Sequence, residues 1–240
     1  MRVTIRKAYD FGGDRDAVGR DLIRPEGWDA ARESSTAFGL PATRPEWERL
    51  ADAPELARRA AAVVAAARRL GARSLCSHGV GTGSLELAVH RAAPELVLTC
   101  TDYAPRATER LRLLFPEARV LVHDLEAEPP PTADFHLMYR IDTELDDDAW
   151  GRVIARFSEP VLFVPALVLD VRRLVKELVR RVVRPRASRA GWLRTEDALD
   201  ALWRDTHDAE PVRVDDLRGF LLTRRQGARR RLIAGRRREP

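Results

Sequence analysis

The chain has 240 residues, of which 45% are hydrophobic and 33% are charged, and its formal net charge at pH 7 is +5. This composition excludes a chain that is disordered throughout, and the length suits one α/β core with additional segments. Two cysteines without paired spacing and no apolar run of about 18 residues give no indication of export or of a membrane span. We therefore expect a cytoplasmic protein.

The positive charge is concentrated at the carboxyl end of the chain. Residues 224–240 carry a net charge of +7, whereas residues 1–223 carry −2. We expect residues 226–240 to form a basic, disordered tail. Because an arginine-rich tail is able to contact phosphate groups, nucleic-acid binding through residues 224–240 is kept as an alternative.

The first part of the chain lacks a clear pattern. Residues 1–45 mix polar residues with isolated aromatics, which predicts an irregular N-terminal cap with one short helix. Apolar residues then recur at helical spacing between Pro54 and Leu70, and Gly71 follows them. We therefore predict a helix here, at the start of the main domain.

Strands and helices alternate between residues 74 and 164. The apolar runs predict strands at 74–78, 96–101, 119–123, 135–139 and 161–164, and the periodic segments predict helices at 83–93, 105–114 and 147–157. Strands separated by helices of this length form parallel sheets with right-handed crossovers and helices on both faces. The predicted fold class is therefore α/β, doubly wound.

The regular alternation of strands and helices ends after Pro165. We expect a basic amphipathic helix at 167–183, a loop through Gly191, a helix at 195–205, and an antiparallel hairpin with strands near Val212 and Phe220. We interpret the helix at 167–183 as a cover for the mouth of a ligand site, and a membrane or partner surface is the alternative.

The most informative segment is Gly79-Val80-Gly81-Thr82-Gly83, between a predicted strand and a predicted helix. Glycines allow a ligand to lie against the backbone, and a helix N-terminus offers free N–H groups. The dinucleotide pattern Gly-x-Gly-x-x-Gly is excluded because its third glycine is replaced by Ser84, and no Gly-Lys-Ser/Thr follows. The segment predicts a different nucleotide-like ligand.

The Gly-x-Gly-x-Gly run, with aspartates after the next two predicted strands, resembles the cofactor site of class I S-adenosylmethionine-dependent methyltransferases. The resemblance covers residues 72–165 well and 195–224 loosely. It implies a Rossmann-like methyltransferase fold in residues 46–225, with an insertion at about 165–195. That fold is a seven-stranded, mostly parallel sheet with one antiparallel edge strand.

The resemblance also assigns the cofactor-binding residues. It implies that Gly79, Gly81 and Gly83 hold the methionine end of S-adenosylmethionine. Asp102, which is followed by Tyr103, ends the second strand and would accept hydrogen bonds from the ribose hydroxyls. From the residues alone, a helix-capping role for Asp102 remains open.

Asp124 and Leu125 follow the third strand. The resemblance implies that Asp124 accepts a hydrogen bond from the adenine amine and that Leu125 packs on the ring, whereas the residues alone also allow an ordinary loop aspartate. The sequence departs from the family at Ser77, where the family commonly has an acid. Because a hydroxyl removes a charge-assisted hydrogen bond, a non-catalytic S-adenosylmethionine-binding module is an alternative.

The segment after the fourth strand contains Tyr139, Arg140 and Asp142, which the resemblance places beside cofactor and substrate. These are the candidate catalytic residues, with Asp142 as a general base toward an O or N nucleophile. From the residues alone, Asp142 as a helix cap and Arg140 as an ion-pair partner are equally supported. The implied function is methyl transfer to an unidentified acceptor, and we expect a small molecule because the folded part shows no basic stripe.

The remaining reactive side chains give no further site. The five histidines are scattered along the chain, no pair has metal-ligand spacing, and no Cys-x-x-Cys motif exists. We therefore predict no metal. Cys76 and Cys100 lie in apolar runs and are expected to be buried thiols.

Overall fold

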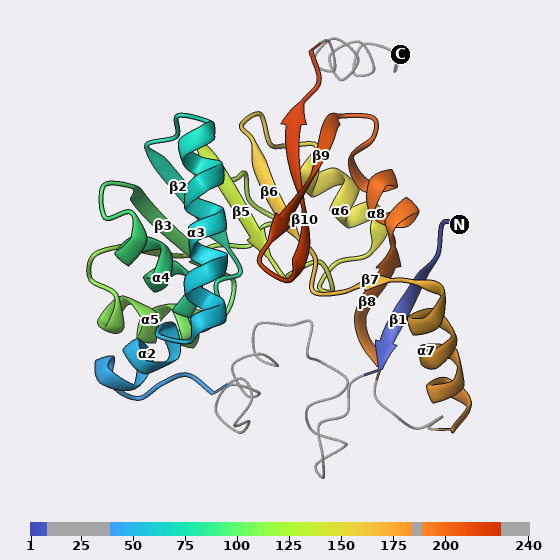
Figure 1. The fold of residues 1–240 in the computed structure, drawn as a ribbon, viewed down its shortest axis with the longest axis horizontal. Coiled ribbons are helices and arrows are strands. Elements are labelled where there is room, and N and C mark those ends of the chain that lie inside the picture. Colours follow the sequence, from blue (N-terminus) through green and yellow to red (C-terminus); the bar gives the residue numbers. More distant parts are fainter. Residues whose placement is uncertain (9–38, 184–188, 227–240) are drawn as a thin grey trace.

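The protein is described by a computed structural model that covers residues 1–8, 39–183 and 189–226. These residues form a seven-stranded sheet and a separate three-stranded sheet (Figure 1). Most of the expected N-terminal cap (9–38) and of the expected basic tail (227–240) lies outside the described residues.

The large sheet has the strand order β4-β3-β2-β5-β6-β10-β9. Strands β2 to β6 are all parallel, and β10 runs antiparallel both to β6 and to the edge strand β9. The strands are β2 (Ser74–His78), β3 (Val97–Asp102), β4 (Arg119–Val122), β5 (Phe135–Tyr139), β6 (Val161–Val164), β9 (His207–Val214) and β10 (Leu217–Arg224). The predicted doubly wound, mostly parallel sheet is thus confirmed.

Helices cover both faces of this sheet. One face carries α2 (Arg44–Ala51), α3 (Pro54–Arg69), α4 (Ser84–Ala92) and α5 (Pro105–Leu114), and the other carries α6 (Asp147–Ile154) and α8 (Glu196–Trp203). Local sequence sets several helix starts: Thr43 and Glu46 form a capping box on α2, and the Asp146 side chain accepts the Ala149 N–H at α6.

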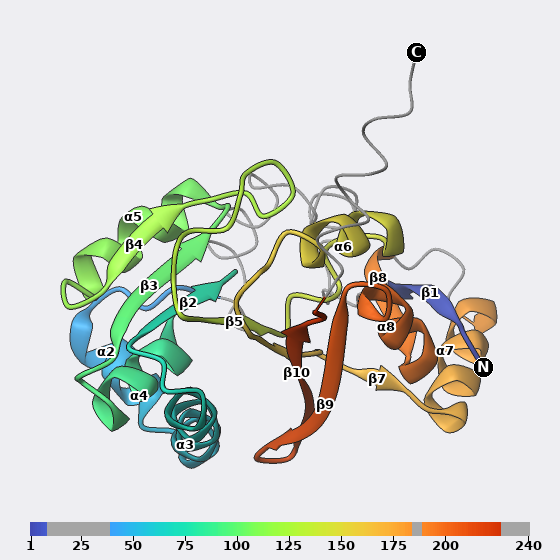
Figure 2. The same ribbon diagram turned by 90° about the horizontal axis from the view of Figure 1, so that it is seen from above.

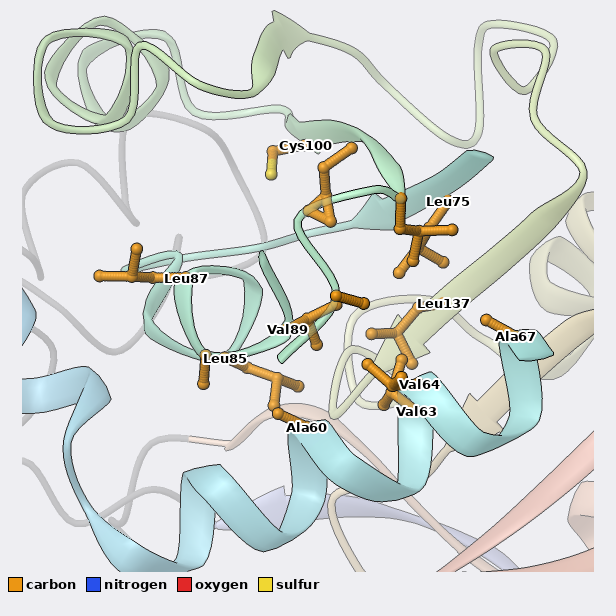
Figure 3. Close-up of a cluster of buried hydrophobic side chains, with 14 of the residues drawn as sticks. Ala60, Val63, Val64, Ala67, Leu75, Leu85, Leu87, Val89, Cys100 and Leu137 are labelled. Carbon is orange, nitrogen blue, oxygen red and sulfur yellow. The ribbon is translucent and has the colours of Figure 1, made fainter. Parts of the chain in front are cut away.

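The core beneath α3 and α4 is apolar. Ala60, Val63 and Val64 of α3 and Val89 of α4 pack with Leu137 of β5 (Figure 3). Each buried valine or leucine side chain contributes about 1.5–3 kcal/mol through removal of apolar surface from water. This core fixes the N-terminus of α4, and therefore the glycine segment before it, against the ends of β2 and β5.

The small sheet has the order β1-β8-β7, with β1 (Thr4–Ala8) antiparallel and β7 (Val168–Leu169) parallel to β8 (Arg189–Thr195). Figures 1 and 2 show it beside α6 and α8, at the end of the molecule opposite β3 and β4. The fully buried Arg194 joins it to the large sheet by donating to Asp147 Oδ1 at 2.7 Å and to the carbonyl oxygens of Asp142 and Leu145.

The small sheet corrects three sequence expectations. The expected irregular cap contributes strand β1, the expected loop through Gly191 is strand β8, and the helix expected from residue 167 begins at Val171, after β7. The reason is that β1 and β8 are short and polar, and each is stabilised by pairing with a segment far away in the sequence. A periodicity search along the chain does not detect such pairing.

Helix α7 (Val171–Val183) packs on β1 and β7 of the small sheet. None of its described residues lines the cavity at the carboxyl ends of β2 and β5, so the interpretation of this helix as a cover for a ligand site finds no support in these contacts. Six of its large apolar side chains are exposed, namely Val171, Val175, Leu178, Val179, Val182 and Val183. In the described ranges, every helix is too short or too polar to cross a bilayer.

Candidate functional site

The glycine segment forms a tight turn between β2 and α4. Gly79, Gly81 and Gly83 all have left-handed φ angles, of 63°, 59° and 69°. A Cβ atom on Gly79 would lie 2.5 Å from Ile141 Cγ2, and one on Gly83 would lie 2.7 Å from a Leu111 methyl carbon. Both the backbone conformation and the neighbouring side chains therefore require glycine at these two positions.

A cavity of about 390 Å³ opens between the carboxyl ends of β2 and β5. This place is the switch point of the sheet, because the chain builds outward through β3 and β4 on one side and through β6 on the other. Open α/β sheets bind their ligands in this position. The polar lining residues come from four elements or their ends and include Arg59, His78, Glu86, Tyr139 and Arg140.

Glu86 is a buried carboxylate in this lining that the sequence analysis missed. Its side chain is in the first turn of α4, the residue is 3% exposed, and Oε1 accepts a hydrogen bond of 2.6 Å from Ser77 Oγ. Burial raises the pKa of Glu86 to about 7, partly offset by the Ser77 hydroxyl. An acid among Leu85, Leu87 and other apolar residues of α4 is the sequence signal that was available.

Arg59 of α3 faces the same cavity. One terminal nitrogen donates to the Tyr139 hydroxyl at 3.1 Å, and the other donates to Asp216 Oδ1 at 2.8 Å. Its Nε is buried and has no hydrogen-bond partner among the described residues. Helical periodicity predicts only the helix that carries Arg59, because its partners come from β5 and the β9–β10 turn.

Asp102 lies at the end of β3, beside the glycine segment, and is 2% exposed. Its carboxylate accepts the Gly81 N–H at 2.9 Å and the Ala104 N–H at 3.0 Å. Asp102 therefore holds the glycine turn in place. Each carboxylate oxygen has more than one lone pair, so these bonds are compatible with an additional hydroxyl donor.

The residues after β5 divide between the cavity and the interior. Tyr139 and Arg140 line the cavity, and Arg140 has a left-handed φ of 62°, which turns the chain so that Ile141 packs on Gly79. Such a conformation is strained for arginine. Asp142 is 1% exposed, accepts the Ala166 N–H, and is absent from the lining of this cavity.

The expected adenine-binding residues lie beyond the end of β4. Asp124 is exposed, and its Oδ1 accepts the Glu126 N–H at 2.8 Å within a turn. Leu125 is partly buried and packs against the core under α6. Tyr103 is partly buried next to Asp102. Neither Asp124, Leu125 nor Tyr103 lines the cavity, so their contacts with a cofactor stay predictions.

Three histidines that are distant in sequence meet on the other face of β2. His78 Nε2 lies 3.1 Å from His136 Nδ1, His78 Nδ1 lies 3.1 Å from Thr101 Oγ1, and the His123 ring is 6.1 Å from that of His78. Burial lowers the pKa of His136 to about 4 and that of His78 well below its usual value. Both rings are therefore neutral at pH 7.

Cys76 lies beside these rings, and the ligand atoms of Cys76, His78 and His136 are within 4.8 Å of one another. Sequence spacing did not reveal this group because its members come from two strands paired side by side, with Cys76 opposite His136. Burial raises the pKa of the Cys76 thiol to about 12, which disfavours the thiolate that binds metals. The absence of a metal stays a prediction.

Comparison with known proteins identifies the fold. No family model matches the chain, and no curated protein matches its sequence. Solved structures do match. PigF with SAH matches with a TM-score of 0.61 and 16% sequence identity, over 90% of this chain and 64% of that one. The mitomycin 7-O-methyltransferase MmcR matches with a TM-score of 0.54 and 21% identity, over 82% of this chain and 60% of that one. Human N-acetylserotonin methyltransferase in complex with SAM also matches, with a TM-score of 0.53 and 16% identity, over 85% of this chain and 68% of that one.

At these identities the similarity shows the fold alone. The chain has the Rossmann-like fold of S-adenosylmethionine-dependent methyltransferases, as the glycine segment predicted. It spans 60–68% of the length of these three proteins. Its own activity and ligands are therefore treated below as proposals.

Proposed function

We propose that this protein binds S-adenosylmethionine in the cavity between β2 and β5 and transfers the methyl group to a small-molecule O or N nucleophile. One observation carries the proposal: a turn of three left-handed glycines, followed by an α4 N-terminus without a side-chain cap, borders a cavity lined by a buried carboxylate and a guanidinium. Two solved structures with this fold are complexes with SAM or SAH, which supports the choice of cofactor.

The residues present fit this cofactor. Gly79 lines the cavity, so the backbone itself borders the ligand space, and Ile141 leaves no room for a Cβ at this position. Asp102 would accept hydrogen bonds from the ribose hydroxyls, since it ends β3 beside the glycine turn, whose Gly81 N–H it accepts. Asp124 and Leu125 follow β4, the strand that pairs with β3, and would bind the adenine.

S-adenosylmethionine supplies a methyl group on an activated sulfonium, so the protein has to bind and align the reactants. Tyr139 and Arg140 line the cavity and would contact the acceptor. Asp142 would act as a general base only if an acceptor reaches its buried side chain, so we rank it below Tyr139 and Arg140. A small-molecule acceptor is favoured because several solved structures with this fold are named for small molecules, such as mitomycin and N-acetylserotonin.

The test is calorimetry of SAM and SAH binding with two matched glycine variants. Gly79→Ala and Gly71→Ala both place a side chain at a left-handed φ, of 63° and 66°, but only the first meets Ile141 and borders the cavity. Strain at such a position costs about 1 kcal/mol in either variant. We expect SAH affinity to fall at least about tenfold in Gly79→Ala, a loss of roughly 1.4 kcal/mol, and to stay unchanged in Gly71→Ala.

Absence of SAM and SAH binding to the unaltered protein would refute the proposal, as would equal affinity in both variants. Turnover is then followed as SAH formation with phenol and amine acceptors. Binding of both ligands without any SAH formation would favour the alternative of a non-catalytic binding module.

A further inference from the structure

Two charged side chains in the cavity have unsatisfied hydrogen-bonding capacity: the buried carboxylate of Glu86 and the partly buried guanidinium of Arg59. Glu86 accepts hydrogen bonds only from the Ser77 hydroxyl and its own backbone, and it forms no ion pair with any described residue. Arg59 is paired with Asp216 through one terminal nitrogen, but its buried Nε has no acceptor in the described part of the chain. Buried charges and buried donors without partners are costly, and proteins retain them mainly where a ligand completes the site.

The two groups are of opposite sign and line the same cavity. A ligand that satisfies both presents a cationic donor to Glu86 and a hydrogen-bond acceptor, best a carboxylate, to the Arg59 Nε–H. A free α-amino acid group has this composition, because its ammonium donates hydrogen bonds and its carboxylate accepts them from a guanidinium. A purely anionic ligand, such as a phosphate, would meet the Glu86 carboxylate and be repelled.

We propose that Glu86 and Arg59 together bind the zwitterionic amino-acid end of the cofactor, with the ammonium group on Glu86 and the carboxylate on Arg59. This inference rests on the proposed function, because it assigns one end of S-adenosylmethionine to the cavity. Ser77 then has a positioning role: its hydroxyl holds the Glu86 carboxylate 2.6 Å away, at the end of β2. The carboxylate that the sequence lacks at position 77 is supplied from α4.

The position of Glu86 supports the assignment. It lies in the first turn of α4, one turn after Gly83, so its carboxylate and the glycine turn border one space. The raised pKa of Glu86 follows from burial without a cation, and an ammonium group in the cavity would favour its ionised form. Arg59 enters from α3 and is held in place by the Tyr139 hydroxyl.

The experiment uses four ligands that differ only at the amino-acid end. They are SAH, its deaminated analogue, its decarboxylated analogue, and 5′-methylthioadenosine, which lacks the whole amino-acid group. Loss of a charge-assisted hydrogen bond weakens binding by about tenfold to a hundredfold. We expect the unaltered protein to bind SAH most tightly, each single-deletion analogue at least about tenfold more weakly, and 5′-methylthioadenosine most weakly.

Two variants then assign each group. Glu86→Gln keeps the size of the side chain and an acceptor for Ser77, and Arg59→Gln removes the guanidinium. We expect Glu86→Gln to weaken SAH at least about tenfold but to leave the deaminated analogue unchanged, and Arg59→Gln to weaken SAH but not the decarboxylated analogue. Glu109→Gln, on the exposed face of α5, and Arg58→Gln, whose arginine pairs with Asp215, are the matched controls.

The outcomes separate the two proposals. If the unaltered protein fails to bind SAH, the proposed function is wrong. If SAH and 5′-methylthioadenosine bind equally well, the cofactor assignment stands and the amino-acid site is refuted. Variants that weaken all four ligands equally would also refute it. Because the ligand series requires only the unaltered protein, the inference is testable even if a variant does not fold.

Discussion

Strand β2 carries a buried polar network on each face, and the two networks differ in completeness. On the α6 face, His78 lies between His136 and Thr101. If Thr101 donates to the Ser77 carbonyl oxygen at 3.3 Å, then His78 Nδ1 donates to Thr101 and His136 Nδ1 donates to His78 Nε2. This assignment places one hydrogen in each of the three contacts, and we call these contacts the closed network because each is satisfied within the protein.

On the α4 face, Ser77, Glu86 and Arg59 form a second group around the cavity, and we call it the open network because its hydrogen-bonding capacity is not fully used within the described residues. Among the residues that the structure describes, the Glu86 carboxylate that accepts the Ser77 hydroxyl has no cationic partner, and the Arg59 Nε–H has no acceptor. A closed polar network stabilises the fold, whereas an open one is completed by a ligand. Strand β2 thus separates a network that stabilises the fold from one that we expect a ligand to complete. Variants on the two faces should therefore have opposite effects on the free energy of unfolding.

The largest expected effect is on the closed side. His136→Ala removes the hydrogen bond to His78 and the edge-to-face contact with Phe157, whose ring centroid is 4.8 Å away. We expect the free energy of unfolding to fall by about 3 kcal/mol, from a cavity and an unsatisfied ring nitrogen. Urea denaturation measures this change.

The control is His90→Ala, at a partly exposed position on α4, which should cost less than about 1 kcal/mol. SAH affinity of folded His136→Ala should stay within about threefold of the unaltered protein, because His136 does not line the cavity. A loss of SAH affinity as large as that of Glu86→Gln would contradict the distinction between the two faces.

The open side should respond in the opposite direction. The folded-state pKa of Glu86, about 7, lies above the unfolded value of 4.5, so its stabilising contribution is complete below pH 4.5 and is lost as pH rises through 7. We expect Glu86→Gln to raise the free energy of unfolding of the ligand-free protein by about 2–3 kcal/mol at pH 8 and by little at pH 4.5.

Urea denaturation across this pH range measures the difference from the unaltered protein. The charged and titratable groups around Glu86 are Asp102 and Cys100 of β3 and, in the shared cavity, Glu55 and Arg59 of α3, His78 of β2, Tyr139 and Arg140. Glu109→Gln should show no such pH-dependent gain. If Glu86→Gln is destabilising at pH 8, then Glu86 has an internal cation or donor and the network is not open.

The contrast between the networks also explains what the sequence could predict. The glycine run and the strand periodicity predicted β2 to β6, because these signals are local and repeat along the chain. The closed histidine network was missed because Cys76 and His136 become neighbours only through the register of β2 with β5. A one-dimensional pattern holds no information on that register.

The candidate site was predicted in part for the same reason. Gly79 and Tyr139 adjoin strand ends, which the sequence locates, and they do line the cavity, whereas Gly81, Gly83 and Asp102 are absent from its lining. Glu86 and Arg59 were missed because they occur inside helices, where a charged residue is usually on the solvent face. Asp142 was expected to face a ligand, but its side chain accepts the Ala166 N–H and its carbonyl oxygen accepts from the Arg194 guanidinium, which is held by strand β8 that the sequence did not predict.

The smallest expected effect tests the link between the strand and the open network. Ser77→Ala removes one hydroxyl that donates to Glu86 and leaves the carboxylate in place. Since that hydrogen bond favours the ionised carboxylate, its loss should weaken SAH binding at pH 7 by about fivefold, or roughly 1 kcal/mol. The matched control is Ser84→Ala, which removes a hydroxyl from the same cavity that contacts Thr82 instead. Calorimetry with both variants measures the difference. If Ser84→Ala weakens SAH as much as Ser77→Ala does, the effect belongs to cavity polarity in general, and the positioning of Glu86 by Ser77 is wrong.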